Sequence, residues 1–211
     1  GDSVSQKKLR TAPLILQLSL LFPYQQGGVF ASTLLLTGGW AAVDRAYSDP
    51  PVTTEQVMHP QKYLDREGPK SVDLPDLQAT MGPQWSLWDD DTMGELDWLG
   101  YLATFLPADR ALKAAAGWGG DRTVLLKNQA GGSALVSASL WDTTADAQEF
   151  YSALNDILRS KPGVQTGSQG SWLTWSEPSR SGYAGLRGDR VLLVITPDEA
   201  TTRRVSGGFG G

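Results

Sequence analysis

The sequence predicts an α+β fold in which an N-terminal helical subdomain precedes an antiparallel sheet packed on helices. Apolar residues recur at three- and four-residue spacing through the first 64 residues, a pattern typical of amphipathic helices. Beyond residue 117 the pattern changes to strand-like runs separated by glycine turns, which indicates β-hairpins. A capped amphipathic helix separates two such hairpins. We therefore expect the second half to run helix, β-β-α-β-β, helix, with helices against one face of the sheet.

The N-terminal segment, residues 1–64, is expected to hold four helices. Their predicted ranges are 3–21, 26–37, 40–47 and a short helix that begins near Thr53 or Thr54 and ends at Pro60. Pro13 is expected to bend the first helix, and Phe22-Pro23-Tyr24 to end it. Gly38-Gly39 is expected to cap the second helix at its C-terminal end.

Residues 65–90 are expected to connect the two halves, because prolines and glycines recur along them. Val72 and Leu74 alternate with polar residues, as in an isolated strand. The run Asp89-Asp90-Asp91 ahead of Thr92 predicts the N-terminal cap of a helix over 93–105. Clustered carboxylates also attract calcium, but their spacing differs from that of an EF-hand loop.

The α+β domain is expected to span residues 91–206 and to end in a flexible tail, 207–211. Its predicted elements are a helix from Pro107 to Gly117, a turn over 117–121, strands 122–127 and 134–140, a helix from Thr143 or Thr144 to Arg159, strands 171–176 and 183–196, and a short helix from Asp198. The turn prediction argues against a phosphate-binding loop, which runs from a strand into a helix.

The composition excludes several classes of function. The chain has no cysteine, so disulfides, thiolate nucleophiles and cysteine-bound metals are excluded. Its net charge of −5 and its lack of long basic runs argue against nucleic-acid binding. The longest apolar stretch, 12–22, is about half the ~20 residues that a membrane-spanning helix needs, so no span is expected.

The candidate site residues are few. His59 is the single histidine, and a zinc site or a Ser-His-Asp triad would need this imidazole together with properly placed partners, of which the sequence shows no complete set. Glu55 lies four residues before it, a spacing that suits either two metal ligands on one helix face or a solvated pair. Trp172 and Trp175 are expected on opposite faces of a strand or at its edge, which leaves one of them available to bind a partner.

Several short motifs occur in a fixed order along residues 1–155. They are Phe22-Pro23-Tyr24-x-x-Gly27 with Phe30, Gly38-Gly39-Trp40-Ala41-Ala42-Val43-Asp44-Arg45-Ala46-Tyr47, Pro50-Pro51-x-x-Thr54-Glu55-Gln56, His59-Pro60-x-Lys62-Tyr63, the run Ala114–Arg122, and Trp141-Asp142-Thr143 with Asp146-Ala147-x-Glu149-Phe150. Together they resemble the C-terminal portion of bacterial zinc metallopeptidases of the gluzincin-like, His-Glu-x-x-His type, many of them secreted or lipoprotein-like.

The resemblance implies that the zinc ligands lie upstream of this chain. Gly1-Asp2-Ser3 is similar to the continuation of the motif that supplies the third ligand in that group. The chain itself then holds no metal ligand and no cofactor, and zinc would come with the upstream segment. Tyr24 and His59 would stabilise the oxyanion of the tetrahedral intermediate across the cleft, unless Tyr24 packs in the core and His59 caps a helix.

Our leading hypothesis is that the chain completes the cleft of such a hydrolase and binds substrate or a partner without being catalytic alone. The partner would be the upstream metal-binding segment or another envelope protein, at an extracytoplasmic location. One alternative is a non-enzymatic protein-binding or assembly module of the cell envelope. Another is a calcium- or carbohydrate-binding surface module.

Overall fold

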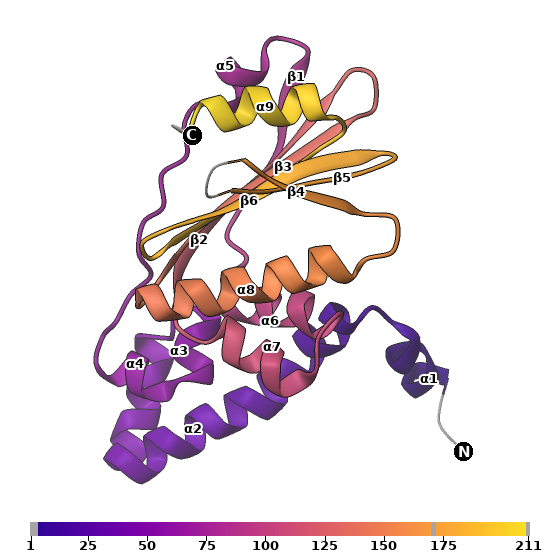
Figure 1. The fold of residues 1–211 in the computed structure, drawn as a ribbon. Helices are drawn as coiled ribbons and strands as arrows, with labels where there is room; N and C mark the ends of the chain where they lie inside the picture. Colours follow the sequence, from indigo (N-terminus) through magenta and orange to yellow (C-terminus); the bar gives the residue numbers. More distant parts are fainter. Residues whose placement is uncertain (1–3, 170–171, 210–211) are drawn as a thin grey trace.

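The computed structural model describes residues 4–169 and 172–209 of the chain (Figure 1). Its helices are α1 (Val4–Thr11), α2 (Leu14–Ser48), α3 (Thr54–Met58), α4 (Pro60–Leu64), α5 (Leu77–Met81), α6 (Gly94–Ala103), α7 (Ala108–Ala115), α8 (Thr144–Ser160) and α9 (Glu199–Gly207). Its strands are β1 (Trp85–Asp91), β2 (Trp118–Asn128), β3 (Ser133–Trp141), β4 (Gln165–Gln169), β5 (Trp172–Glu177), β6 (Arg180–Arg187) and β7 (Arg190–Thr196).

The strands form one sheet of seven in the order β1-β2-β3-β7-β6-β5-β4, and each neighbouring pair is antiparallel. The centre of the sheet is apolar: Val136 of β3 pairs with Val124 on one side and Val194 on the other. The predicted α+β class is therefore confirmed.

Helices cover both faces of the sheet, so the prediction of helices on one face is wrong (Figure 1). On one face, α6, α7 and α8 pack against the strands through a core that includes Trp98, Trp118, Trp141 and Phe150. On the other face, α5 and α9 lie over a second core that includes Met81, Val136 and Val205. The helices α2, α3 and α4 lie beyond α6 and α7, away from the sheet. No helix of the described residues has both the length and the apolar character that crossing a membrane would require.

The N-terminal helices differ from the prediction. The bend at Pro13 is confirmed, since α1 ends before it and α2 begins after it. The break at residues 22–24 is wrong, because α2 continues through Pro23. Proline removes the backbone hydrogen bond to the carbonyl of Ser19, and Ser19 is exposed, so water can satisfy that group. At Gly39 the backbone is non-helical (φ 66°, ψ −167°), so the predicted interruption appears as a kink within α2.

The connecting segment also differs from the prediction. Val72 and Leu74 form no strand; Val72 is buried in the core under α9, in a stretch bounded by prolines. Residues 85–90 are predicted to belong to the connecting segment and Asp89–Asp91 to cap the next helix. Instead, residues 85–91 form strand β1. The division into 1–64, 65–90, 91–206 and 207–211 stays a prediction.

The acidic run is not a helix cap. Asp89, Asp90 and Asp91 lie in the edge strand β1, where Asp90 pairs with Arg122. The amides at the start of α6 are capped instead by Asp121, whose carboxylate accepts hydrogen bonds from the N–H groups of Met93 and Gly94, each at 3.0 Å. A cap from a different strand leaves no local signature in the sequence.

Around Asp121 the predicted turn is wrong too. The turn reduces to Gly117 (φ +77°), and β2 begins at Trp118. Glycine is needed at position 120 because a Cβ there would lie 2.2 Å from the backbone oxygen of Lys70, which crosses the strand at this point.

The remaining elements follow their local signals. Thr53, Thr143 and Asp198 cap α3, α8 and α9, and Thr143 forms a reciprocal capping box with Asp146. The hairpin β2–β3 and helix α7 are confirmed. The predicted strand 183–196 is two strands joined at Gly188 (φ +61°), and β4 was missed. Gly207 ends α9 and so is not part of a tail, whereas residues 1–3, 171 and 210–211 lie outside the described residues.

Candidate functional site

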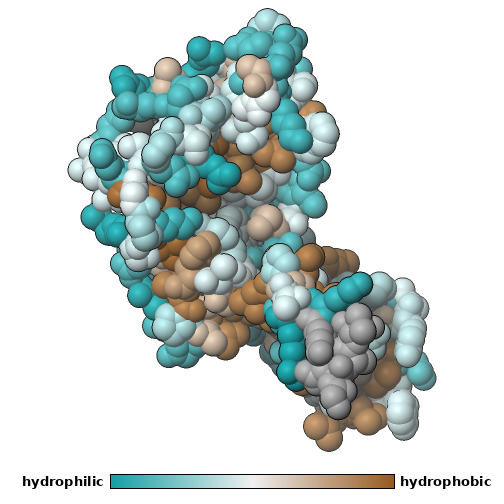
Figure 2. Space-filling model, turned by 90° about the vertical axis from the view of Figure 1, so that its right-hand side faces the viewer, coloured by the Kyte–Doolittle hydropathy of each residue, from teal (hydrophilic) through white to brown (hydrophobic). Residues whose placement is uncertain are grey.

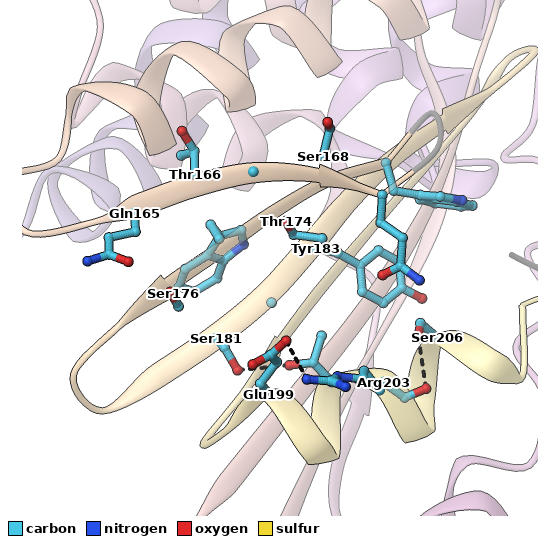
Figure 3. Close-up of a pocket in the computed structure, with 16 residues that line it drawn as sticks. Gln165, Thr166, Ser168, Thr174, Ser176, Ser181, Tyr183, Glu199, Arg203 and Ser206 are labelled. Atoms are coloured by element: carbon cyan, nitrogen blue, oxygen red, sulfur yellow. Dashed lines mark hydrogen bonds and ion pairs between the residues drawn. The ribbon is translucent and has the colours of Figure 1, made fainter.

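A hollow of about 650 Å³ lies between the outer strands β4–β6 and helix α9 (Figure 3). Its volume falls within the range of about 300–1,000 Å³ typical of small-molecule sites. Thr174 and Tyr183 project from the sheet toward α9, whose Glu199, Arg203 and Ser206 lie on the opposite wall (Figure 3). We call this hollow the β4–β6/α9 pocket.

Two local features shape this pocket. The Asp198 carboxylate accepts a hydrogen bond from the N–H of Thr201 at 2.7 Å, which begins α9 directly after β7 and brings it back across the sheet. On β6, Gly185 leaves room for the indole of Trp172, since a Cβ at this position would lie 1.4 Å from Cε3 of that ring. Trp172 in turn meets the ring of Tyr183 edge-on, with centroids 5.3 Å apart.

Tyr183 is the unusual residue of the pocket. Its side chain is 4% exposed, and its hydroxyl has no hydrogen-bond partner among the described protein atoms. Burial raises the pKa of the Tyr183 phenol, so the group stays protonated near neutral pH. A buried hydroxyl without a partner costs about 1–3 kcal/mol. A ligand atom that hydrogen-bonds to it would offset that cost.

The described lining of the pocket carries little net charge. Glu199 and Arg203 form an ion pair with each other, Oε1 to Nη2 at 2.6 Å. The hydroxyls of Ser181 and Thr202 lie 3.0 Å apart and form a hydrogen bond. The other polar lining groups are mostly neutral hydroxyls and amides. The pocket therefore favours uncharged polar ligands over ions.

The two predicted binding tryptophans both border this pocket. They lie on opposite faces of β5: Trp172 packs against the α9 side and Trp175 against Leu158 and Leu173 on the α8 side. Trp175 is 6% exposed, and its indole Nε1 also lacks a partner among the described protein atoms. Neither residue has a tested binding role.

A second polar cluster joins the N-terminal helices to the end of β3. The ammonium of Lys62 donates to Glu55 and Glu67, each at 2.7 Å, and to Asp142. The three carboxylates lie close enough together to hold a metal ion, with ligand atoms within 4.8 Å of one another. Lys62 already lies among them and supplies a positive charge, so we describe the group as an ion-pair cluster and assign no metal to it.

The cluster contains more negative than positive charge. Burial raises the pKa of Glu55 to about 7, with further contributions from Asp142 and Glu95, although Lys62 opposes the shift. Burial would lower the pKa of Lys62, but its hydrogen bonds to Asp142, Glu55 and Glu67 outweigh burial and raise it. We conclude that Lys62 stays charged at neutral pH and that Glu55 takes up a proton near pH 7.

His59 and Glu55 contact different partners. His59 ends α3, and its Nε2 lies 2.8 Å from Oε1 of Glu95, whereas Glu55 contacts Lys62. The hydrogen bond to Glu95 raises the pKa of His59, although burial opposes the shift. Glu95 is 1% exposed, and its second oxygen, Oε2, has no partner among the described protein atoms.

Tyr24 lies on α2 with 82% of its side chain exposed, and it has no hydrogen bond within the described part of the chain. The role of Tyr24 and His59 as oxyanion stabilisers stays a prediction.

Sequence reasoning missed Tyr183, Lys62 and Glu95 as site residues. The motif His59-Pro60-x-Lys62 contained the lysine, but its partner Asp142 is 80 residues away.

Comparisons with known proteins show a family and a distant structural similarity. No curated protein matches the chain. Among solved structures, the chain is similar to the extracellular domain of PknH from Mycobacterium tuberculosis, with 7% identity and a TM-score of 0.44 over 62% of this chain and 85% of that one. That similarity is too low to support a conclusion about function. The model of a domain of unknown function, DUF8575, matches residues 85–206, from the start of β1 into α9. This match covers more than half of the chain, which therefore belongs to the DUF8575 family.

Proposed function

We propose that this domain is a binding module that holds a small, uncharged polar ligand in the β4–β6/α9 pocket. The observation that carries the proposal is Tyr183, a residue of the pocket lining whose buried hydroxyl has no partner among the described protein atoms. Protein interiors rarely leave such a group unsatisfied unless it serves a function. The paired charges of Glu199 and Arg203 support an uncharged ligand.

The substitution Tyr183→Phe tests this proposal. It removes one oxygen and keeps the ring, so the ligand-free domain is expected to gain about 1 kcal/mol in free energy of unfolding. At the same time it should weaken ligand binding about tenfold, equivalent to 1.4 kcal/mol. Thermal unfolding measures the stability, and a screen of uncharged polar compounds by ligand-observed NMR measures the binding.

Tyr151→Phe is the matched control, because its hydroxyl donates a bond of 3.4 Å to the carbonyl of Ala184 from α8. It should leave ligand binding unchanged and give no gain in stability. Hits that bind Tyr183→Phe as tightly as the native chain would rule out the pocket as their site.

We also propose, from the family resemblance, that the chain completes the cleft of an extracytoplasmic zinc-peptidase-like protein and is not catalytic alone. The supporting observation is the apolar surface of α2. Its exposed large apolar side chains are Leu16, Leu20, Leu21, Tyr24, Val29, Leu35, Leu36, Trp40 and Tyr47. Apolar surface lies around the projecting N-terminal lobe in Figure 2. So many exposed apolar side chains on one helix are consistent with a surface that another polypeptide covers, and the proposed occupant is the upstream metal-binding segment.

Native mass spectrometry of material from the source organism tests this second proposal. We expect an upstream polypeptide with a His-Glu-x-x-His segment and about one zinc ion per chain, and we expect Leu36→Ser with Trp40→Ser to release it. Recovery of the chain without metal and bound to a different envelope protein would favour the assembly-module alternative.

A further inference from the structure

The β4–β6/α9 pocket also indicates what class of ligand it holds, an inference that rests on the binding function proposed above. Two properties of the described lining narrow the choice. Its neutral polar side chains, such as Gln165, Gln169 and Ser176, can each donate and accept hydrogen bonds. Its aromatic residues Trp172 and Tyr183 add apolar surface.

Hydroxyl-rich ligands fit this combination. A sugar hydroxyl both donates and accepts, as does the phenol of Tyr183, so one group on the ligand can satisfy that hydroxyl in either direction. The C–H face of a sugar ring is apolar and packs against aromatic rings, as other apolar groups do. An anionic ligand would meet Glu199 and Arg203, whose charges are already paired.

Trp172 also borders a second hollow. This hollow has a volume of about 250 Å³, and besides Trp172 its lining consists of Asp73, Pro75, Gly185, Arg187, Arg190, Leu192 and Phe209. Trp172 therefore lines both hollows, and its indole lies against Gly185. A ligand of several rings can occupy both hollows and pack against Trp172, whereas a single ring can occupy only one.

We propose that the β4–β6/α9 pocket binds a neutral oligosaccharide, with Trp172 as the aromatic platform and Tyr183 as the buried hydrogen-bonding partner. The amide side chains on β4 would contact hydroxyl or acetamido groups at the open side of the pocket. No bond is made or broken in this binding.

The test is a titration of the ¹⁵N-tryptophan-labelled chain with four defined probes. Two are neutral trisaccharides, the trimer of N-acetylglucosamine and maltotriose; the third is trigalacturonate, and the fourth is the capped peptide N-acetyl-trialanine amide. We expect at least one neutral trisaccharide to shift the indole signal of Trp172, assigned from Trp172→Phe. The corresponding monosaccharide should bind at least tenfold more weakly, and trigalacturonate more weakly than either neutral trimer.

The variants make the assignment specific. Trp172→Ala and Tyr183→Phe should each weaken trisaccharide binding about tenfold, whereas Trp88→Ala, at a 64% exposed tryptophan on β1, should not change it. Tyr183→Phe keeps the test valid if Trp172→Ala does not fold.

The possible outcomes separate the two proposals. Binding of the capped peptide but of neither neutral saccharide, with a shift of the Trp172 signal, would overturn the saccharide class and keep the pocket as a binding site. Binding of no probe together with a gain in stability for Tyr183→Phe would also overturn the saccharide class alone. Binding of no probe and no gain in stability would overturn both proposals.

Discussion

Replacing Lys62 with methionine is expected to lower the free energy of unfolding by about 3–5 kcal/mol at pH 8, because the change leaves buried negative charge uncompensated. Lys62 contacts all three of Glu55, Glu67 and Asp142, whereas Lys70 lies 3.9 Å from Asp142 alone; the Glu55 side chain is 4% exposed. Methionine keeps the length and the apolar stem of the side chain. Urea unfolding of the variant and the native chain measures the difference.

The same substitution should cost less in acid. Burial raises the pKa of Glu55 in the folded state to about 7, above its ordinary value of 4.5, so the folded protein binds this proton more tightly than the unfolded chain does. The Glu55 contribution to stability is therefore present below pH 4.5 and is lost as the pH rises through 7. At pH 5 Glu55 is protonated, and the cost of losing Lys62 should be smaller than at pH 8.

Lys113→Met is the matched control for Lys62→Met. Lys113 pairs with Glu149 at 2.6 Å, but its side chain is 73% exposed, and pairs of this kind contribute less than about 1 kcal/mol. If the two variants lose the same free energy of unfolding, or if the loss for Lys62→Met does not depend on pH, the cluster does not stabilise the contact between the N-terminal helices and the sheet.

The substitution Asp121→Ala is expected to cost about 4 kcal/mol. The Asp121 carboxylate is 6% exposed and accepts hydrogen bonds from the backbone of Met93 and Gly94, from the indole of Trp118 at 2.8 Å and from the hydroxyl of Thr123. Alanine leaves at least two buried donors without a partner, and each unsatisfied donor lowers the free energy of unfolding by about 1–3 kcal/mol. Denaturant unfolding measures the loss, and hydrogen exchange should show that α6 opens first.

Asp89→Ala separates this result from a general effect of losing an acidic residue. Asp89 is exposed on β1, where its carboxylate accepts only from the neighbouring N–H of Asp90 among the described residues. Its loss should change stability by less than about 0.5 kcal/mol. A cost at Asp89 that matched the cost at Asp121 would mean that the acidic run caps α6 after all.

Elements whose signals are local could be predicted from the sequence. Thr143 caps α8 through Asp146, three residues on, and the β2–β3 hairpin closes at the predicted Gly131-Gly132 turn. Strand β1 could not be predicted, because a single buried side chain, Trp85, is followed by six exposed residues, and no alternation marks it as a strand. Its place is set by pairing with β2, which lies more than 30 residues away.

The candidate site was predicted only in part for the same reason. Trp172 and Trp175 were named from the sequence because aromatic residues in a strand are visible there. Tyr183 was not, because its lack of a hydrogen-bond partner depends on the packing of β6 against α9 and β5. The partners of His59 and Lys62 likewise lie 36 and 80 residues further along the chain.

The order of strands has a consequence for synthesis of the chain. The two halves of the sheet meet where β3 pairs with β7, and Leu135 there faces Ile195, some sixty residues later. Until the ribosome has released residue 196, the apolar strand β3 is an unprotected edge beside a finished hairpin, and pairings this distant in sequence form slowly. The nascent β3 edge can pair with other chains during that interval, so a low concentration of nascent chains should favour the native product over aggregates.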